Sequence, residues 1–388
     1  MENKRKLWQQ EQLTRSQEVL ERSGYAAWLI CTTASRDPHI FFLTGRQSPG
    51  RTALLVTSSN ATLLVSDMDT GLFMDLSKVF TIESYSNRRE FTKKLAILLK
   101  TQTRNGPVAL DHAPQSLETA AASVDFVTYG EFLSLVHLAP EIEFKSAVPF
   151  IEELRKTKTS YERKFAQKAN KITQEILEDL PNRVQPGMTE RQVAAMIGGE
   201  LLNHGELAFP IIVASGQNSA NPHHNTKDEK LHSNEILLID AGLRLELMCS
   251  DLTYTFFMGR NPPEQVISVY DSLYAALGSA LQMIRPRVRC GDVDLAARTK
   301  LKEFGQDPKY FIHSLGHPIG LEVHDIGPRL SSSNQKTSEK QLPLNSLYTI
   351  EPGLYFPGKW GVRLEIDVHI TDSGAKALST VPSQLVTI

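Results

Sequence analysis

The sequence predicts two domains, an α/β domain over residues 1–148 and an α+β domain over residues 149–388. In the first part, short apolar runs alternate with helical patterns, which is typical of an α/β fold. In the second part, charged helical patterns come first, and the end of the chain consists mainly of strand and turn patterns. A chain of 388 residues, 41% of them hydrophobic, is long enough for two or three domains with large cores.

The first domain is expected to begin with an amphipathic helix over residues 5–23 that ends at Gly24. Helical patterns also occupy residues 91–99 and 117–122. The apolar or β-branched runs between these helices are residues 26–31, 40–43, 53–57, 62–65, 79–82, 108–110 and 126–128. This alternation predicts a sheet covered by helices.

The second domain is expected to begin with one long helix, or two, over residues 150–180. Thr189 and Gln192 form a capping-box pattern at the start of another helix, which runs to residues 203–205. Further expected elements are a strand over residues 211–214, helices over 263–284 and 292–304, and a solvated loop over 331–340.

The composition excludes several classes of partner. A net charge of −2 gives no basic surface for nucleic acid or for an anionic membrane. No apolar run approaches the roughly 20 residues that a membrane span needs, and the N-terminus does not resemble a secretory signal. Three scattered cysteines are too few for a disulfide framework, which favours a reducing, cytoplasmic location.

A candidate metal site begins at Asp240, which follows the apolar run 236–239. A hairpin turning at residues 245–246 would place Asp240 opposite Asp251. Cross-strand Cβ atoms lie about 4.5–5.5 Å apart, so the two carboxylates would repel unless a cation lay between them. Because the turn lacks an Asn-Gly signal, an ordinary hairpin with both carboxylates in water is the alternative for this stretch.

A second acidic hairpin supports the metal hypothesis. A turn centred on Gly358 would place Glu351 opposite Glu365. Between the two hairpins lie three histidines in a stretch whose glycines and proline exclude a continuous helix, namely His313, His317 and His324. Four carboxylates and one imidazole suit a pair of divalent ions, with Mn²⁺ favoured over Fe, Co or Zn by the oxygen-rich ligands.

These residues resemble the motifs of the pita-bread-fold metallopeptidases, the family of Xaa-Pro dipeptidase (prolidase), aminopeptidase P and methionine aminopeptidase. The resemblance covers about residues 150–375. It is carried by Ile239-Asp-Ala-Gly242, Ser250-Asp-Leu-Thr253, His313-Ser-Leu-Gly-His317, Gly320-Leu-Glu-Val-His324, Thr349-Ile-Glu-Pro-Gly353 and Val362-Arg-Leu-Glu365. It implies a C-terminal pita-bread domain with a curved, mostly antiparallel sheet covered by helices. Residues 40–45 also resemble a motif of the N-terminal domain of prolidase and aminopeptidase P, with His39 where Asn is common.

The resemblance implies a dinuclear metal site in which two divalent ions share carboxylate ligands. The implied ligands are Asp240, Asp251, His317, Glu351 and Glu365. Of these, Asp251 and Glu365 are expected to bridge the two ions.

The resemblance also implies catalytic roles for three residues. His223 and His324 are expected to hydrogen-bond the substrate and the developing oxyanion, and Glu351 is expected to transfer the proton. The candidate substrate-binding residues are His313, Arg329 and Arg363.

Each substrate-binding candidate has a simpler alternative. His313 could be a packing residue, Arg329 could point into solvent, and Arg363 could pair either with a ligand carboxylate or with a surface acid. His224, beside His223, is expected to be exposed. Pro318 and Tyr254 replace residues usual in the family and are expected to alter the shape of the pocket.

The resemblance implies a cytoplasmic metallopeptidase whose metal-bridging hydroxide hydrolyses the Xaa-Pro bond, with dipeptides as the favoured substrate. The alternatives are an aminopeptidase P acting on longer Xaa-Pro peptides, a non-peptide amide or ring hydrolase or lyase using the same metals, and a catalytically silent binding module. The expected partners are a small peptide substrate and a second copy of the chain in a homodimer.

Overall fold

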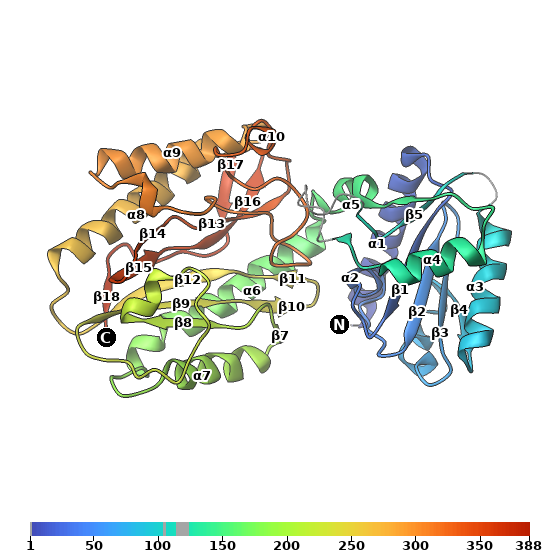
Figure 1. Cartoon of the computed structure of the whole chain (residues 1–388), viewed down its shortest axis with the longest axis horizontal. Coiled ribbons are helices and arrows are strands. Elements are labelled where there is room, and N and C mark those ends of the chain that lie inside the picture. Colours follow the sequence, from blue (N-terminus) through green and yellow to red (C-terminus); the bar gives the residue numbers. More distant parts are fainter. Residues whose placement is uncertain (1, 104–105, 114–123) are drawn as a thin grey trace. The chain divides into compact units, whose positions relative to one another are not determined.

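The computed structural model describes residues 2–103, 106–113 and 124–388, and the chain divides into two compact units, Met1–Lys156 and Thr157–Ile388 (Figure 1). The division lies after the boundary expected at residue 148, because helix α5 (Val148–Arg155) packs within the first unit. There, Phe150 of α5 contacts Trp28, with ring centroids 4.9 Å apart. The helical pattern over residues 117–122 lies outside the described residues.

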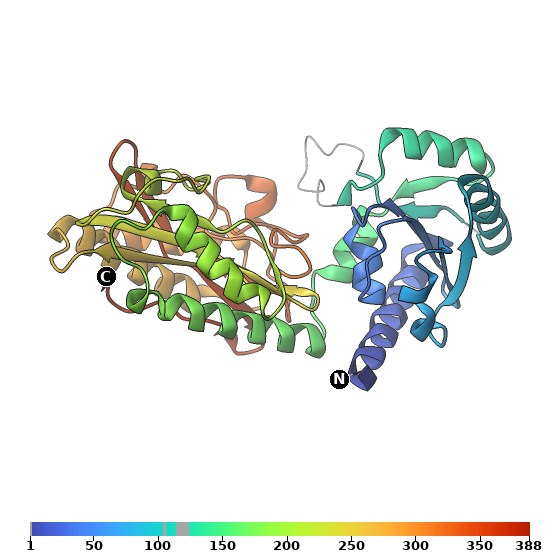
Figure 2. The ribbon, with the colours of Figure 1, turned by 90° about the horizontal axis from the view of Figure 1, so that it is seen from below.

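The first unit contains a six-stranded mixed sheet in the order β4-β3-β2-β1-β5-β6. The strands are β1 (Ala27–Thr33), β2 (Arg51–Val56), β3 (Ala61–Ser66), β4 (Thr81–Tyr85), β5 (Val108–Leu110) and β6 (Phe144–Ser146). The other helices are α1 (Glu2–Ser23), α2 (Pro38–Thr44), α3 (Arg88–Gln102) and α4 (Tyr129–Leu138). Helices α3 and α4 pack on the sheet face that includes Leu29 and Leu55, whereas Trp28 belongs to the opposite face (Figure 2). The predicted α/β class is confirmed.

Two strand expectations in this unit are wrong. Residues 40–43 belong to α2, because Asp37 caps the helix by accepting a hydrogen bond from the His39 amide and Pro38 is its first residue. Gly45 ends α2 in the left-handed conformation, with φ 64°. Residues 126–128 lead into α4, for which Thr128 is the N-cap.

The second unit is built from several small, mostly antiparallel sheets that share one hydrophobic core with four long helices. The helices are α6 (Ser160–Glu178), α7 (Glu190–Leu202), α8 (Glu264–Met283) and α9 (Cys290–Glu303), and α10 (Gln335–Ser338) is short. The strands of the first half are β7 (Glu206–Leu207), β8 (Ile212–Ser215), β9 (Glu235–Ala241), β10 (Leu243–Leu245), β11 (Met248–Cys249) and β12 (Leu252–Met258). Those of the second half are β13 (Leu347–Ile350), β14 (Gly353–Phe356), β15 (Trp360–Arg363), β16 (Ile366–Thr371), β17 (Gly374–Ala377) and β18 (Val386–Thr387).

The helices cover the strands from two sides. Helix α6 contacts β10, β11 and β12, and α7 contacts β7 and β8. On the other side, α8 contacts β14, β15 and β17, and α9 packs on α8 (Figure 1). Residues 150–180 therefore form two main helices, α5 and α6, of which α6 starts at a capping box between Thr159 and Glu162. Within the described part of the chain, no helix is long and apolar enough to cross a membrane.

The first acidic hairpin has a different register from the expected one. Arg244 faces Cys249 and Leu245 faces Met248, so the turn falls at residues 246–247, with Glu246 in the left-handed region at φ 53°. Asp240 consequently faces Thr253 rather than Asp251. Because side chains alternate along a strand, Asp251 still belongs to the same face as Thr253.

The second acidic hairpin has the expected register. Gly353 faces Arg363, and on the other side of a short break Ile350 faces Ile366. Glu351 and Glu365 therefore lie level with each other in the break between the two ladders. The turn contains Gly358 in the left-handed region, at φ 73°.

Candidate active site

The five side chains expected to bind metals come together in the second unit at the ends and breaks of its strands. Asp240, Asp251, His317 and Glu365 are buried, and Glu351 is partly buried. His317 Nε2 lies 3.6 Å from Asp251 Oδ2 and 3.6 Å from Glu351 Oε1. Ligand atoms of Asp251, His317 and Glu365 all lie within 4.8 Å of one another. This spacing suits carboxylates and an imidazole converging on a cation.

The electrostatics of the cluster also fit divalent cations. Burial, followed by repulsion from Glu365, raises the pKa of both Asp251 and Glu351 well above the usual range. Burial and then Asp240 raise the pKa of Glu365 to about 7. Among the described residues, Asp240 Oδ1 and Asp251 Oδ1 are buried without a hydrogen-bond partner. Buried carboxylates of this kind are stabilised by coordinating a metal.

His317 is prepared to act as a neutral ligand. Its Nδ1 lies 3.0 Å from the Pro318 carbonyl oxygen, to which it can donate a hydrogen bond, so Nε2 keeps its lone pair for the carboxylate side. Burial, followed by the charge of His324, lowers the pKa of His317 to about 3. Pro318 thus orients the ligand histidine through its carbonyl group.

Three further histidines surround the cluster. The ring of His324 packs edge-on against His317, with centroids 4.3 Å apart, and His324 is exposed. His313 Nδ1 lies 3.7 Å from Glu351 Oε2, and its Nε2 lies 3.0 Å from the Tyr355 hydroxyl. His223 is exposed, and its charge acts on Asp240 and His324. The structure therefore places His313 and His324 next to predicted ligands, whereas His223 lies within electrostatic range of Asp240.

The two candidate arginines lie in different environments. Arg363 is 4% exposed and pairs through Nη2 with Asp240, so the alternative that it pairs with a surface acid is wrong. Its Nε donates to Thr253 Oγ1 over 2.9 Å, and its Nη1 donates to the Tyr355 hydroxyl over 3.1 Å. Arg329 is exposed and forms no hydrogen bond with the described residues, but its charge acts on His324 and Glu351. Arg363 supports the ligand shell, and Arg329 lies at the open rim.

Several residues of the site were not predicted from sequence. Tyr355 joins His313 to Arg363 through its hydroxyl group. Asp367 is buried and accepts hydrogen bonds from the Asp251 amide over 3.1 Å and from Asn170 Nδ2 over 2.8 Å, which orients the Asp251 segment. Because Asp367 follows the predicted ligand Glu365 by two positions on an expected strand, the period of two could have pointed to it.

Two expectations about neighbouring residues are wrong. His224 is buried rather than exposed, because its Nε2 hydrogen-bonds Glu190 Oε2 over 2.8 Å. Tyr254 does not shape the pocket, because it points away from the face of Thr253 into the hydrophobic core. Its hydroxyl group donates to the Thr380 carbonyl over 2.5 Å.

A second group with metal-ligand spacing lies in the first unit and consists of Asp37, His39 and Asp111, all buried. His39 Nδ1 lies 2.9 Å from Asp37 Oδ1 and 2.8 Å from Asp111 Oδ2. Burial lowers the pKa of His39, but Asp111 and Asp37 outweigh it and raise the pKa to about 9. Arg155 Nη1 lies 3.0 Å from His39 Nε2, and Trp28 Nε1 donates to Asp111 over 2.6 Å. The two carboxylates favour a protonated His39, whereas a hydrogen bond from Arg155 needs the lone pair of a neutral Nε2, and in either state Arg155 adds positive charge beside the carboxylates.

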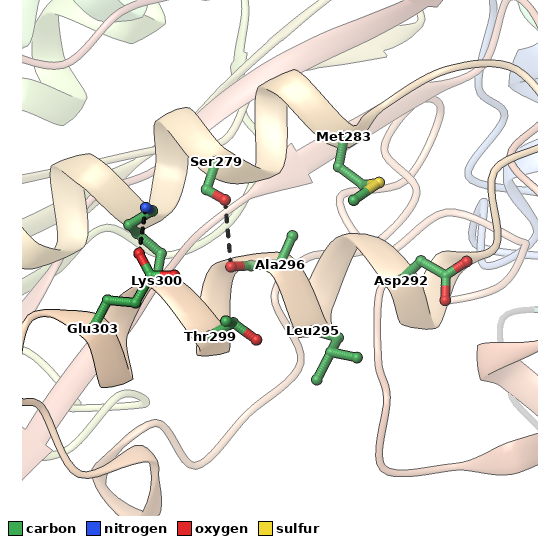
Figure 3. A pocket seen from close by; sticks show the side chains of 8 residues that line it. All are labelled: Ser279, Met283, Asp292, Leu295, Ala296, Thr299, Lys300 and Glu303. Atoms are coloured by element: carbon green, nitrogen blue, oxygen red, sulfur yellow. Dashed lines mark hydrogen bonds and ion pairs between the residues drawn. The ribbon is translucent and has the colours of Figure 1, made fainter.

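A groove of about 400 Å³ between α8 and α9 is separate from the candidate site (Figure 3). Its lining residues are Ser279, Met283, Asp292, Leu295, Ala296, Thr299, Lys300 and Glu303. None of these is a predicted ligand or substrate-binding residue, so the groove has no part in the metal chemistry.

Comparison with known proteins agrees with this architecture. Residues 164–372 match the model of metallopeptidase family M24, and residues 12–157 match the creatinase/prolidase N-terminal domain. The chain is 28% identical to the Xaa-Pro dipeptidase of Pyrococcus horikoshii, over 95% of this chain and 97% of the relative. It is 33% identical to the putative dipeptidase YkvY of Bacillus subtilis, over 70% and 73% of the two chains.

The fold is also found among solved structures. The X-Pro aminopeptidase of Thermotoga maritima superposes with a TM-score of 0.82 at 26% identity, covering 95% of this chain and 99% of that one. The family match spans more than half of the chain, and the donor set of the site is that of a metal-dependent hydrolase. The chain therefore belongs to metallopeptidase family M24, with a pita-bread peptidase domain that follows a creatinase/prolidase N-terminal domain.

Proposed function

We propose that this chain is a metal-dependent Xaa-Pro dipeptidase. The observation that carries the proposal is the convergence of four carboxylates, three of them buried, and one buried neutral imidazole, with exposed histidines and an exposed arginine nearby. The names of the relatives, an Xaa-Pro dipeptidase and a putative dipeptidase, support the choice of substrate class.

The ligand set suits two divalent ions held by Asp240, Asp251, His317, Glu351 and Glu365. When bound, such ions polarise an amide carbonyl and lower the pKa of water towards neutrality. The oxygen-rich set favours Mn²⁺, with Co, Zn or Fe as alternatives.

The remaining chemistry comes from side chains of the chain itself. Burial and the charge of Arg329 lower the pKa of His324, so this exposed imidazole can donate a hydrogen bond to a substrate carbonyl as a neutral group. His223 approaches the same space from another loop and would bind the substrate. Glu351 is partly buried beside His317 and His313, and its carboxylate would take up a proton and pass it to the leaving nitrogen.

Arg329 supports a dipeptide rather than a longer substrate. A guanidinium binds a carboxylate bidentately, and Arg329 forms no hydrogen bond within the described residues that would occupy it. A second candidate is cleavage of longer Xaa-Pro peptides, favoured by the similarity to the X-Pro aminopeptidase of Thermotoga maritima. In that case the rim would have to admit further residues beyond the proline.

A substrate panel tests the proposal. Ala-Pro, Ala-Pro-Ala and Met-Ala-Ser are incubated with the protein in Mn²⁺ and, separately, in EDTA. We expect Mn²⁺-dependent cleavage of Ala-Pro that exceeds cleavage of the other two peptides. Equal or better cleavage of Ala-Pro-Ala would favour the second candidate. Metal binding without cleavage of any peptide would instead favour a non-peptide substrate or a silent binding module.

Two further parts of the proposal concern the state of the protein in the cell. A cytoplasmic location is supported by three cysteines, Cys31, Cys249 and Cys290, that are all buried and free. The homodimer expected from sequence stays a prediction, which light scattering coupled to gel filtration would test. The net charge of −2 supports the expectation that neither nucleic acid nor an anionic membrane is a partner.

A further inference from the structure

The loop that carries His223 is fastened to one buried carboxylate, that of Glu190. Glu190 is the first residue of α7 and is fully buried. Its Oε1 accepts hydrogen bonds from the Ser215 amide over 2.9 Å, from Ser215 Oγ over 3.0 Å and from Asn218 Nδ2 over 2.8 Å. Its Oε2 accepts from His224 Nε2 over 2.8 Å and from the Lys227 amide over 3.0 Å. One side chain thus holds the beginning, the middle and the end of the segment 215–227.

These hydrogen bonds keep the carboxylate ionised. Burial raises the pKa of Glu190, but the hydrogen bonds from Ser215, His224 and their neighbours outweigh it, so the pKa lies below its usual value. Hydrogen bonds to a charged group are about twice as strong as neutral ones, which makes Glu190 a firm anchor for a loop that otherwise has little regular structure. Apart from the short 3₁₀ turn Gly216–Ala220, the segment contains no helix or strand after β8.

The same loop is fastened on its other side to the strand that carries Arg363. The Gly361 amide donates to Ser219 Oγ over 2.9 Å, and Arg363 Nη1 donates to the Pro222 carbonyl over 3.4 Å. Gly361 permits this approach, since a Cβ atom there would lie 2.2 Å from the Ser219 carbonyl oxygen. The backbone just before His223 is therefore held between Glu190 and the ligand shell.

The two adjacent histidines have opposite surroundings. His224 is 5% exposed and its ring is hydrogen-bonded to Glu190, whereas His223 is exposed and acts electrostatically on Asp240 and His324. Fixing the ring of His224 on one side determines where the backbone presents His223 on the other. A displacement of about 1 Å of a catalytic group can reduce turnover about 100-fold.

We propose that Glu190 and His224 are positioning residues that hold the His223 loop in its productive conformation against the metal site. The inference rests on the proposed function in one respect, namely that His223 contacts the substrate. Neither residue touches the predicted metal ligands, so metal content separates their role from that of the ligand shell.

The single variants are Glu190→Gln, His224→Leu and His224→Gln. His224→Leu is also combined with His223→Ala. Gln at position 190 keeps the size of the side chain. Its NH₂ group is a donor, however, and would face groups that donate to the carboxylate of Glu190. Gln at position 224 can still donate to Glu190, whereas Leu cannot. The matched control is Asp228→Asn, because Asp228 directly follows this segment, is exposed and, among the described residues, pairs with Arg191 of α7.

With Ala-Pro and Mn²⁺, kcat is expected to fall about 10- to 100-fold in Glu190→Gln and in His224→Leu, with metal content unchanged. His224→Gln and Asp228→Asn should retain most of the turnover. In the His223→Ala background, His224→Leu should change kcat by less than about twofold, because a residue that acts through His223 has no further effect once His223 is absent. Equal losses with and without His223 would overturn the inference.

Hydrogen exchange gives a readout that does not depend on turnover. The amides of residues 215–227 should exchange faster in Glu190→Gln and His224→Leu than in the parent protein, while those of β9 and β12 stay unchanged. Unchanged exchange of this segment would show that Glu190 does not hold it and would also overturn the inference. If the unmodified protein cleaves no Xaa-Pro peptide, the proposed function fails, and the exchange measurement still decides whether Glu190 positions the loop.

Discussion

Glu365→Gln should stabilise the metal-free protein at alkaline pH and destabilise the metal-loaded one. Glu365 is 2% exposed, and burial together with repulsion from Asp240 raises its pKa from 4.5 to about 7. At about 1.36 kcal/mol per pKa unit, the ionised side chain is about 3 kcal/mol less favourable in the folded metal-free protein than in the unfolded chain. A neutral glutamine removes this penalty, whereas it cannot bridge two cations.

The pH dependence follows from the raised pKa. Below about pH 4.5 the carboxyl group is neutral in both states and carries no penalty; the penalty grows as the pH rises and is complete above about pH 7. In EDTA, the free energy of unfolding of Glu365→Gln should therefore exceed that of the parent by about 3 kcal/mol at pH 8 and by under about 1 kcal/mol at pH 5. Urea denaturation at the two pH values measures both differences.

Adding Mn²⁺ should reverse the order at pH 8. A ligand at 1,000 times its Kd stabilises the folded state by about 4.1 kcal/mol per site, which exceeds the penalty of about 3 kcal/mol, and only the parent keeps both sites. Elemental analysis should show about two ions in the parent and one or none in the variant. The exposed Asp372→Asn serves as a control for the change in charge. A variant that is less stable than the parent in EDTA at both pH values, or that retains two ions at unchanged affinity, would refute the reasoning.

Three further predictions concern the rim of the site and its support. In His324→Ala, kcat should fall about 10²- to 10³-fold, because a donor to the developing oxyanion is lost. Elemental analysis should still find both metals, and calorimetry should find the Tm of the parent. Unchanged turnover with a large loss of stability would mark His324 as a packing residue. Arg329→Met should raise KM for Ala-Pro and spare Ala-Pro-Ala, whose carboxylate lies farther out, and equal effects on both peptides would exclude a role in binding the dipeptide carboxylate. Lys158→Met should lower the free energy of unfolding in urea by about 3–5 kcal/mol, because Lys158 Nζ lies 2.9 Å from Asp325 Oδ2 and both side chains are buried. A loss below about 1 kcal/mol would show that Asp325 keeps enough other partners.

The chemistry of the site could be predicted from short motifs, because each supplies its own local geometry. Pro357-Gly358 encodes a turn, and the register that follows from this turn brings Glu351 level with Glu365. The alternation of apolar runs and helical patterns predicted the α/β class of the first unit for a similar reason, since burial follows the period of each element. The capping box of Thr189 and Gln192 likewise marked the start of α7.

Only the tertiary structure decided the first hairpin and the partners of the buried charges. Its turn places Glu246, not a glycine, in the left-handed region, and pairing along the whole of β9 and β12 outweighs this local preference. His224 is hydrogen-bonded to Glu190, and Arg363 forms an ion pair with Asp240. Each pair joins residues that are far apart in the chain. Local patterns predict helices, strands and the residue types of a site. A buried charge, in contrast, is stabilised by a distant group that packing brings within hydrogen-bond reach. The fold as a whole therefore determines which residue becomes its partner.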